Sequence, residues 1–151
     1  MRIDDVNIHE IQDSSDEDWL RLRSELWPSL SQTEHQAELE QFVTNPRFKA
    51  LMVRSPEGIA IGFAEAYLRE DYVNGCETSP VAFLEGIFVR PEFRRQGVAR
   101  RLCEAIEQWA RAQGCSEFAS DVLLENHVSQ AMHIHLGFEE TERVVYFKKK
   151  L

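Results

Sequence analysis

Apolar and polar residues follow two periods along this chain, and each period predicts one kind of element. Alternation at every second position indicates strands, whereas recurrence at helical spacing after a Ser or Asp cap indicates helices. Strands are expected at 2–11, 48–54, 59–68, 81–89, 118–122 and 138–148, and helices at 16–28, 31–44, 97–113 and 128–136. The predicted order of elements is therefore β-α-α-β-β-β-α-β-α-β.

This order of elements sets the fold class. The middle of the chain joins strands directly as hairpins, which favours antiparallel pairing, and the second half alternates strand, helix and strand. We therefore expect an α/β or α+β fold with one mixed central sheet flanked by helices. No repeat, low-complexity tract or linker divides the sequence, so residues 1–151 are expected to form a single domain.

The charge balance narrows the set of partners. The 151 residues include 17 Lys and Arg against 26 Asp and Glu, which gives a net charge of −9. This acidity disfavours nucleic acid and anionic membranes and suits a cationic small molecule. No apolar run approaches the roughly 20 residues of a membrane span. The first residues include acids where a leader peptide carries bases, so we expect a cytoplasmic protein. The three cysteines form no C-x-x-C pair, and we expect them to be reduced thiols.

One basic segment interrupts this acidic chain. The strand at 81–89 leads into a turn with Arg94 and Arg95, and Gly97 then opens the third helix. The first N–H groups of a helix have no partner within the helix and lie at the positive end of its dipole. Small residues at Gly97 and Ala99 let an anion approach these groups, and the arginines add charge. The segment predicts a phosphate cradle whose spacing differs from the G-x-G-x-x-G and P-loop motifs.

Two motifs resemble those of the GNAT (Gcn5-related N-acetyltransferase) superfamily. Residues 94–99, Arg-Arg-Gln-Gly-Val-Ala, resemble its motif A, [R/Q]-x-x-G-x-[G/A], and residues 126–138 resemble its N-x-x-[AS]…LGF signature. The resemblance implies that acetyl-CoA, as cosubstrate, lies where two parallel strands splay apart. The cofactor-binding residues it implies are Ile87, Phe88, Val89, Arg94, Arg95, Gln96, Gly97, Val98, Ala99, Arg100, Asn126 and Ser129, the first three through their backbones.

Further blocks of sequence concern the acceptor, because they lie outside the cofactor motif. They resemble the aminoglycoside 6'-N-acetyltransferases at 26–28, 71–76, 83–89, 119–121 and 137–144. The acceptor-binding residues that this resemblance implies are Trp27, Tyr72, Glu85, Asp121 and Glu142. The last of these is implied to reach the antibiotic from the paired subunit of a homodimer. Trp27 also fits the apolar stripe of its helix, so core packing is an alternative role.

Glu85 is the residue best suited to act as a base. The acceptor amine must lose a proton before it attacks, because a protonated amine has no lone pair. A carboxylate in an otherwise apolar strand is costly unless it has a partner or faces solvent, and Asp121 on the neighbouring strand poses the same question. We therefore expect direct transfer, in which both acids bind the amine and Glu85 accepts its proton, directly or through water.

His133 stands where many members of the superfamily have a tyrosine general acid, just before the Leu-Gly-Phe block. A histidine can protonate the departing thiolate near neutral pH. A thiol with a pKa of about 8.5 also leaves as the anion. His133 is therefore a candidate general acid, and the alternative that it takes no part in the reaction is equally good. The histidines 127, 133 and 135 do not follow a zinc pattern, and no metal is expected.

Three functions are open at this point. The first is acetyl transfer from acetyl-CoA to the 6'-amine of aminoglycoside antibiotics, which confers resistance. The second is GNAT acetylation of a polyamine, another small amine or a protein amino group, and the third is noncatalytic acyl-CoA binding. Glu85 and Asp121 disfavour the third, and the acidic charge together with the blocks around Tyr72 and Asp121 favours the first over the second.

Overall fold

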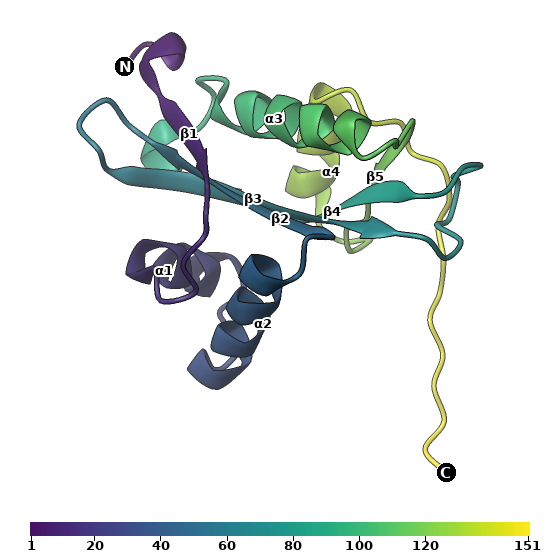
Figure 1. The fold of residues 1–151 in the computed structure, drawn as a ribbon. Coiled ribbons are helices and arrows are strands. Elements are labelled where there is room, and N and C mark those ends of the chain that lie inside the picture. Colours follow the sequence, from purple (N-terminus) through teal and green to yellow (C-terminus); the bar gives the residue numbers. More distant parts are fainter.

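A single five-stranded sheet with helices on both faces organises the protein, which the computed structural model describes over residues 1–151. The strands are β1 (Asn7–Glu10), β2 (Phe48–Arg54), β3 (Ala60–Arg69), β4 (Val81–Val89) and β5 (Phe118–Ser120), and the helices are α1 (Glu17–Leu26), α2 (Gln32–Thr44), α3 (Val98–Ala112) and α4 (His127–His135). The strands lie in the order β1-β2-β3-β4-β5. Helices α1 and α2 cover one face, and α3 and α4 lie on the other (Figure 1).

Side-chain caps start three of the helices, the first two of them where the sequence predicts a start. The Asp16 carboxylate accepts from the Trp19 N–H at 3.0 Å, and the Ser31 hydroxyl accepts from the Glu34 N–H at 3.1 Å. The Asn126 side chain caps α4 in the same way. Each cap satisfies one N–H that the first helical turn leaves unpaired.

The mixed sheet expected from the order of elements is confirmed. Strands β1 to β4 pair antiparallel, and β4 pairs parallel with β5 after the α3 crossover. Pairing between β4 and β5 covers only three positions and ends at Leu84 opposite Ser120. The rest of β4, from Glu85 to Val89, therefore has an open edge on the side of β5.

A bulge in β4 lies at the point where this open edge begins. Gly86 faces Glu65 of β3, while the next pair is Leu84 with Ala66, so Glu85 has no partner on β3. A bulge leaves one residue out of the ladder and bends the strand, which redirects that side chain. Glu85 is accordingly exposed between the buried residues Leu84 and Gly86.

Apolar side chains fill both faces of the sheet. The cluster under α1 and α2 includes Trp19, Leu39 and Phe63, all fully buried. The cluster under α3 includes Leu102 and Ile106, which are also fully buried. These two layers pack β4 between helices on both faces, so the positions of the bulge and of the open edge are fixed by the core.

No helix of the protein combines the length and apolarity needed to cross a membrane.

The predicted last strand, 138–148, is wrong. Residues 138–151 form no regular element: Phe138 still packs against the Phe118 ring, with 5.1 Å between the ring centroids, and the chain then leaves the body as an extended arm that ends clear of the sheet and the helices (Figure 1). The arm exposes four consecutive large apolar residues, Val144, Val145, Tyr146 and Phe147. The apolar residues of this segment favour a strand, but a strand also needs a neighbouring strand to which its backbone can hydrogen-bond. The arm pairs with no strand of its own chain.

Candidate active site

The turn before α3 has the geometry of an anion cradle. Arg95 and Gly97 both adopt positive φ, of 62° and 89°, and this curls the backbone into the start of the helix. The first helical bond is the Arg101 N–H to the Gly97 carbonyl at 3.1 Å, and the N–H groups of residues 95–100 donate no hydrogen bond within the chain. A run of free donors at a helix start fits a pyrophosphate, so this part of the chain suits coenzyme A.

The arginines of this turn divide into two kinds. Arg94 donates from Nε to the Val89 carbonyl at 2.7 Å and lies over the Phe88 ring at 5.5 Å, so it braces the turn against β4. Arg100 donates to the His135 carbonyl at 2.9 Å and links α3 to the end of α4. Arg95 makes no ion pair within the chain and is exposed, which leaves its charge available to a ligand.

The strand residues expected to bind the cofactor by their backbones lie on the open edge of β4. Ile87, Phe88 and Val89 pair with β3 on one side, and β5 has ended before it reaches them on the other. Their side chains also pack in the core, because the Phe88 and Phe63 rings pack together with 6.4 Å between their centroids, and Val89 is buried. Both roles considered from the sequence, core packing and an available backbone, are therefore compatible with the structure.

Glu85 and Asp121 come together at the splay. Each follows the last paired position of its strand, Leu84 in β4 and Ser120 in β5. Partial loss of hydration raises the pKa of Glu85, and the negative charges of Asp121 and Glu38 raise it further. A carboxyl group with a raised pKa next to a second acid is typical of a group that exchanges protons at an active site.

The Trp27 ring lies directly against the bulge. A methyl group added at Gly86 would come within 2.4 Å of Cη2 of Trp27, so the ring covers this glycine. Trp27 also meets Phe63 edge to face at 6.2 Å between ring centroids and is half-buried. It therefore packs on the core and borders the Glu85 site at the same time.

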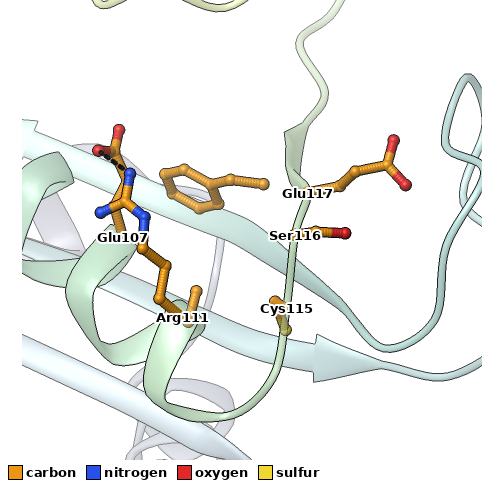
Figure 2. A pocket seen from close by; sticks show the side chains of 7 residues that line it. Glu107, Arg111, Cys115, Ser116 and Glu117 are labelled. Carbon is orange, nitrogen blue, oxygen red and sulfur yellow. Dashed lines mark ion pairs between the residues drawn. The ribbon is translucent and has the colours of Figure 1, made fainter.

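A cavity of about 250 Å³ adjoins Glu85. It is lined by Glu38, Gln41, Phe42, Phe48, Tyr67 and Glu85. Two carboxylates and three aromatic rings suit an acceptor that carries both positive charge and sugar rings. A second cavity, of about 310 Å³, lies between the end of α3 and the start of β5, next to the Glu107–Arg111 ion pair (Figure 2), and contains none of the expected site residues.

His133 is held in a hydrogen-bonded chain at the end of β5. Its Nδ1 lies 2.7 Å from the Ser129 carbonyl, so Nδ1 carries a proton, and its Nε2 lies 2.8 Å from the Ser120 hydroxyl. Ser120 in turn reaches the Leu84 carbonyl at 3.3 Å, on the last pair before the splay. The His, Cys, Asp and Glu side chains form no group of three that would hold a metal ion.

Of four other expected site residues, Asn126 and Ser129, expected at the cofactor, lie at the start of α4, and Tyr72 and Glu142, expected at the acceptor, are exposed. Asn126 uses its side-chain oxygen to cap α4 by accepting from the Ser129 N–H at 3.1 Å, which gives both residues a structural role. Tyr72 is 69% exposed in the loop after β3. Glu142 is exposed on the arm and lines neither cavity.

Comparison with known proteins places this geometry in a family. Residues 16–138, which span the cradle, the splay and α4, match the model of the acetyltransferase (GNAT) family. The chain belongs to the GNAT acetyltransferase family. It is therefore an acyltransferase that uses acetyl-CoA as cosubstrate, in agreement with the resemblance of the two motifs.

Named relatives of this GNAT protein share one description. The aminoglycoside N(6')-acetyltransferase type 1 of Serratia marcescens is 53% identical over 133 residues, which cover 88% of this chain and 91% of the relative. The enzyme of the same name from Acinetobacter baumannii is 50% identical over 146 residues, which cover 97% and 99% of the two chains.

Two solved GNAT structures overlay on this chain. The 6'-N-acetyltransferase AAC(6')-Ih from Acinetobacter baumannii has a TM-score of 0.92 at 50% identity, covering 97% of this chain and 99% of that one. AAC(6')-Iy in complex with the bisubstrate analogue CoA-S-monomethyl-acetylneamine has a TM-score of 0.91 at 44% identity, with the same coverage of both chains.

Sequence reasoning missed a buried ion pair beside the GNAT site. Arg23 and Glu65 are 1% and 0% exposed, and Nε of Arg23 donates to Oε1 of Glu65 at 2.5 Å. A signal for Arg23 was present, since it falls four residues after Trp19 and four before Trp27, on the apolar stripe of α1. Glu65 also stands alone in an apolar strand, the same pattern that singled out Glu85.

Proposed function

We propose that this protein is an aminoglycoside 6'-N-acetyltransferase, which transfers the acetyl group of acetyl-CoA to the 6'-amine of aminoglycoside antibiotics and so confers resistance. The observation that carries the proposal is the meeting of Glu85 and Asp121 at the splay of β4 and β5, beside a cavity with a further acid. An acidic, aromatic-lined acceptor site suits a polycationic sugar. The descriptions of relatives at 41–53% identity support the same substrate.

In the proposed reaction the acids hold the acceptor and Glu85 takes its proton. Glu85 and Asp121 bind the 6'-ammonium, with Trp27 and Tyr72 contacting the sugar. Glu85 then accepts a proton from the nitrogen, directly or through water, because only the neutral amine attacks the acetyl carbon. A C–N bond forms, the C–S bond breaks, and the coenzyme A thiolate leaves with the electron pair of that bond, while the nitrogen, positively charged after the attack, loses its second proton to solvent. Free N–H groups on the open edge of β4 stabilise the charge that develops on the carbonyl oxygen.

We propose that coenzyme A binds along the open edge of β4 and the cradle that follows. Ile87, Phe88 and Val89 offer their backbone groups to the pantetheine arm. The free N–H groups of residues 95–100, with the charges of Arg94 and Arg95, hold the pyrophosphate. Asn126 and Ser129 border this site while they cap α4.

His133 is the proposed proton donor to the departing thiolate. Its Nε2 contacts the Ser120 hydroxyl at the last β4–β5 pair, so a proton passes from Nε2 to Ser120 Oγ as Ser120 gives its own proton to sulfur. The contact of Nδ1 with the Ser129 carbonyl fixes the orientation of the ring in this role. A thiolate leaves without help at high pH, so this step matters most near neutral pH and below.

We further propose that the protein acts as a homodimer in the cytoplasm. The arm exposes Val144, Val145, Tyr146 and Phe147, and β5 presents an unpaired strand edge. Exposed apolar runs and open edges are covered in stable proteins, and a second copy supplies both parts at once. Glu142 on the exchanged arm then approaches the acceptor site of the other subunit. The free thiols of all three cysteines fit a reducing compartment.

The position of the acetyl group on the product tests the proposed function. Tobramycin, which carries a 6'-amine, is incubated with the enzyme and acetyl-CoA, and the product is mapped by two-dimensional NMR. We expect a single acetyl group on the 6'-nitrogen. Acetyl on another nitrogen, or recovery of unmodified tobramycin from enzyme that binds coenzyme A, would overturn the proposal.

A further inference from the structure

A buried arginine connects three elements of the fold behind the acceptor site. Arg23 of α1 is 1% exposed, and its guanidinium donates to both oxygens of Glu65 in β3, from Nε at 2.5 Å and from Nη2 at 3.1 Å. Nη2 also donates to Oε2 of Glu38 in α2 at 2.5 Å, and Nη1 lies 2.9 Å from Nδ1 of His35. Burial works against the charged form, but Glu65 and Glu38 outweigh it and raise the pKa of Arg23.

Stability alone is a weak reason for this arrangement. Replacing a buried ion pair by apolar residues of similar size is often neutral or stabilising, since both charges lose their hydration in the core. The network also leaves one group unsatisfied. His35 accepts from Arg23 at Nδ1, so its Nε2 carries the proton, and this buried N–H has no acceptor. A group of charges that the fold keeps at such a cost suggests a role in the reaction.

Two contacts of Arg23 lead to the site. Its guanidinium carbon lies 4.7 Å from the centroid of the Trp27 ring, and the far end of that ring lies against Gly86, beside the bulge at Glu85. Its Nη2 fixes Glu38, which lines the same cavity as Glu85. Arg23 therefore determines the place of one ring and one carboxylate, both of which border Glu85.

We propose that Arg23 is a positioning residue of the acceptor site, which holds the Trp27 ring against β4 and the Glu38 carboxylate in the cavity wall. The proposal rests on the proposed function, because it concerns the acceptor rather than coenzyme A. The planar guanidinium is needed for it, since only a flat group with several donors binds two carboxylates and stacks on a ring together.

The charge of Arg23 also acts on Glu85. The groups that face Glu85 are Asp121 after β5, Glu38 of α2, Arg23 of α1, and Arg69 and Tyr67 of β3. The two acids raise the pKa of Glu85, and the two arginines lower it. Removing Arg23 therefore raises the pKa of Glu85 further. Because the base works as the carboxylate, the acid limb of the pH profile then moves to higher pH.

The test compares two variants of the full-length enzyme with a matched control. Arg23→Met combined with Glu65→Gln leaves no lone charge in the core and keeps an oxygen for the Trp19 Nε1–H, which donates to Glu65 at 2.9 Å. Arg23→Lys keeps the charge but not the planar group. Arg54→Met is the control, since it removes a positive charge that also pairs with α1, at Asp18, away from Trp27.

We expect the double variant to raise the KM for kanamycin roughly tenfold, with the KM for acetyl-CoA unchanged, and to move the acid limb upward. Arg23→Lys should return the acid limb of the pH profile to its wild-type position but leave the KM for kanamycin raised. Arg54→Met should match the wild type in the acid limb and in the KM for kanamycin. Equal changes in the two KM values, or none, would make Arg23 purely structural and overturn the proposal. If the double variant does not fold, Arg23→Lys decides the question alone.

A second readout is independent of turnover. Acrylamide quenching of tryptophan fluorescence is measured with and without Trp27→Phe in each background, so that the difference isolates Trp27. We expect Trp27 to become more accessible in the double variant. Unchanged accessibility would overturn the proposal even if the wild type failed to acetylate kanamycin, and that failure by itself would overturn only the proposed function.

Discussion

Gly97→Ala perturbs the cradle through backbone conformation alone. Gly97 has φ +89°, and a methyl group there would meet only Ile3, at 3.5 Å, so space is not the obstacle. A residue with a Cβ in the left-handed region costs about 1–2 kcal/mol. The chain relieves this strain by leaving the conformation in which the N–H groups of residues 95–100 converge. The fraction of molecules competent to bind then falls, and the affinity for coenzyme A falls with it.

The strain sets the size of the effect. About 1–2 kcal/mol corresponds to a roughly 5–30-fold increase in the Kd for coenzyme A, measured by isothermal titration calorimetry. The same strain lowers the Tm by roughly 2–8 °C. Gly114→Ala is the matched control, since Gly114 has φ +88° and nothing within 4 Å, at the opposite end of α3. We expect Gly114→Ala to lose Tm similarly but to bind coenzyme A as tightly as the wild type. Wild-type affinity in Gly97→Ala, or equal weakening in both variants, would refute the cradle.

Three other perturbations probe the acceptor side. Glu85→Gln should lower kcat far more than it weakens coenzyme A binding. Because the pKa of Glu85 is raised, the acid limb of kcat/KM in the wild type should lie above the ordinary glutamate range, and this limb should disappear in the variant. Equal turnover in the variant and the wild type would show that Glu85 is not the base. Gly86→Ala places a methyl group 2.4 Å from Trp27 and should raise the KM for kanamycin severalfold without changing that for acetyl-CoA, as steady-state kinetics will show. Removal of residues 139–151 should yield a monomer in analytical ultracentrifugation with a raised kanamycin KM, and an unchanged mass would contradict the exchanged arm.

Local patterns predicted most of the fold because the relevant interactions are local. The helix starts near Asp16 and at Ser31, the helical stripes and the bounds of β2 and β4 depend on neighbours in sequence, and each was found where the pattern placed it. The last strand failed for the opposite reason. Its apolar residues are real, but whether 138–148 forms a strand depends on a neighbouring strand edge, and sequence periodicity does not tell which chain supplies that edge.

The site shows the same division. Motif A lies in one continuous segment, so the sequence predicted a turn with free N–H groups at the start of α3, whereas the positive φ of Arg95 and Gly97 was found only in the structure. Arg23, Glu38 and Glu65 come from three separate elements, and only packing brings them together. The bulge at Glu85 results from the register between β3 and β4, and no residue type in either strand predicts that register. The acid in an apolar strand was a sound signal at Glu85, but at Glu65 it marked a buried ion pair.

The most direct test of the account is a thiol-release assay with acetyl-CoA and a panel of amines: kanamycin, tobramycin, a 6'-hydroxy aminoglycoside, spermidine and a lysine peptide. We predict turnover with kanamycin and tobramycin and none with the 6'-hydroxy compound, because the proposed function requires an amine at that position. Turnover with spermidine or the peptide alone would contradict the assignment to aminoglycosides.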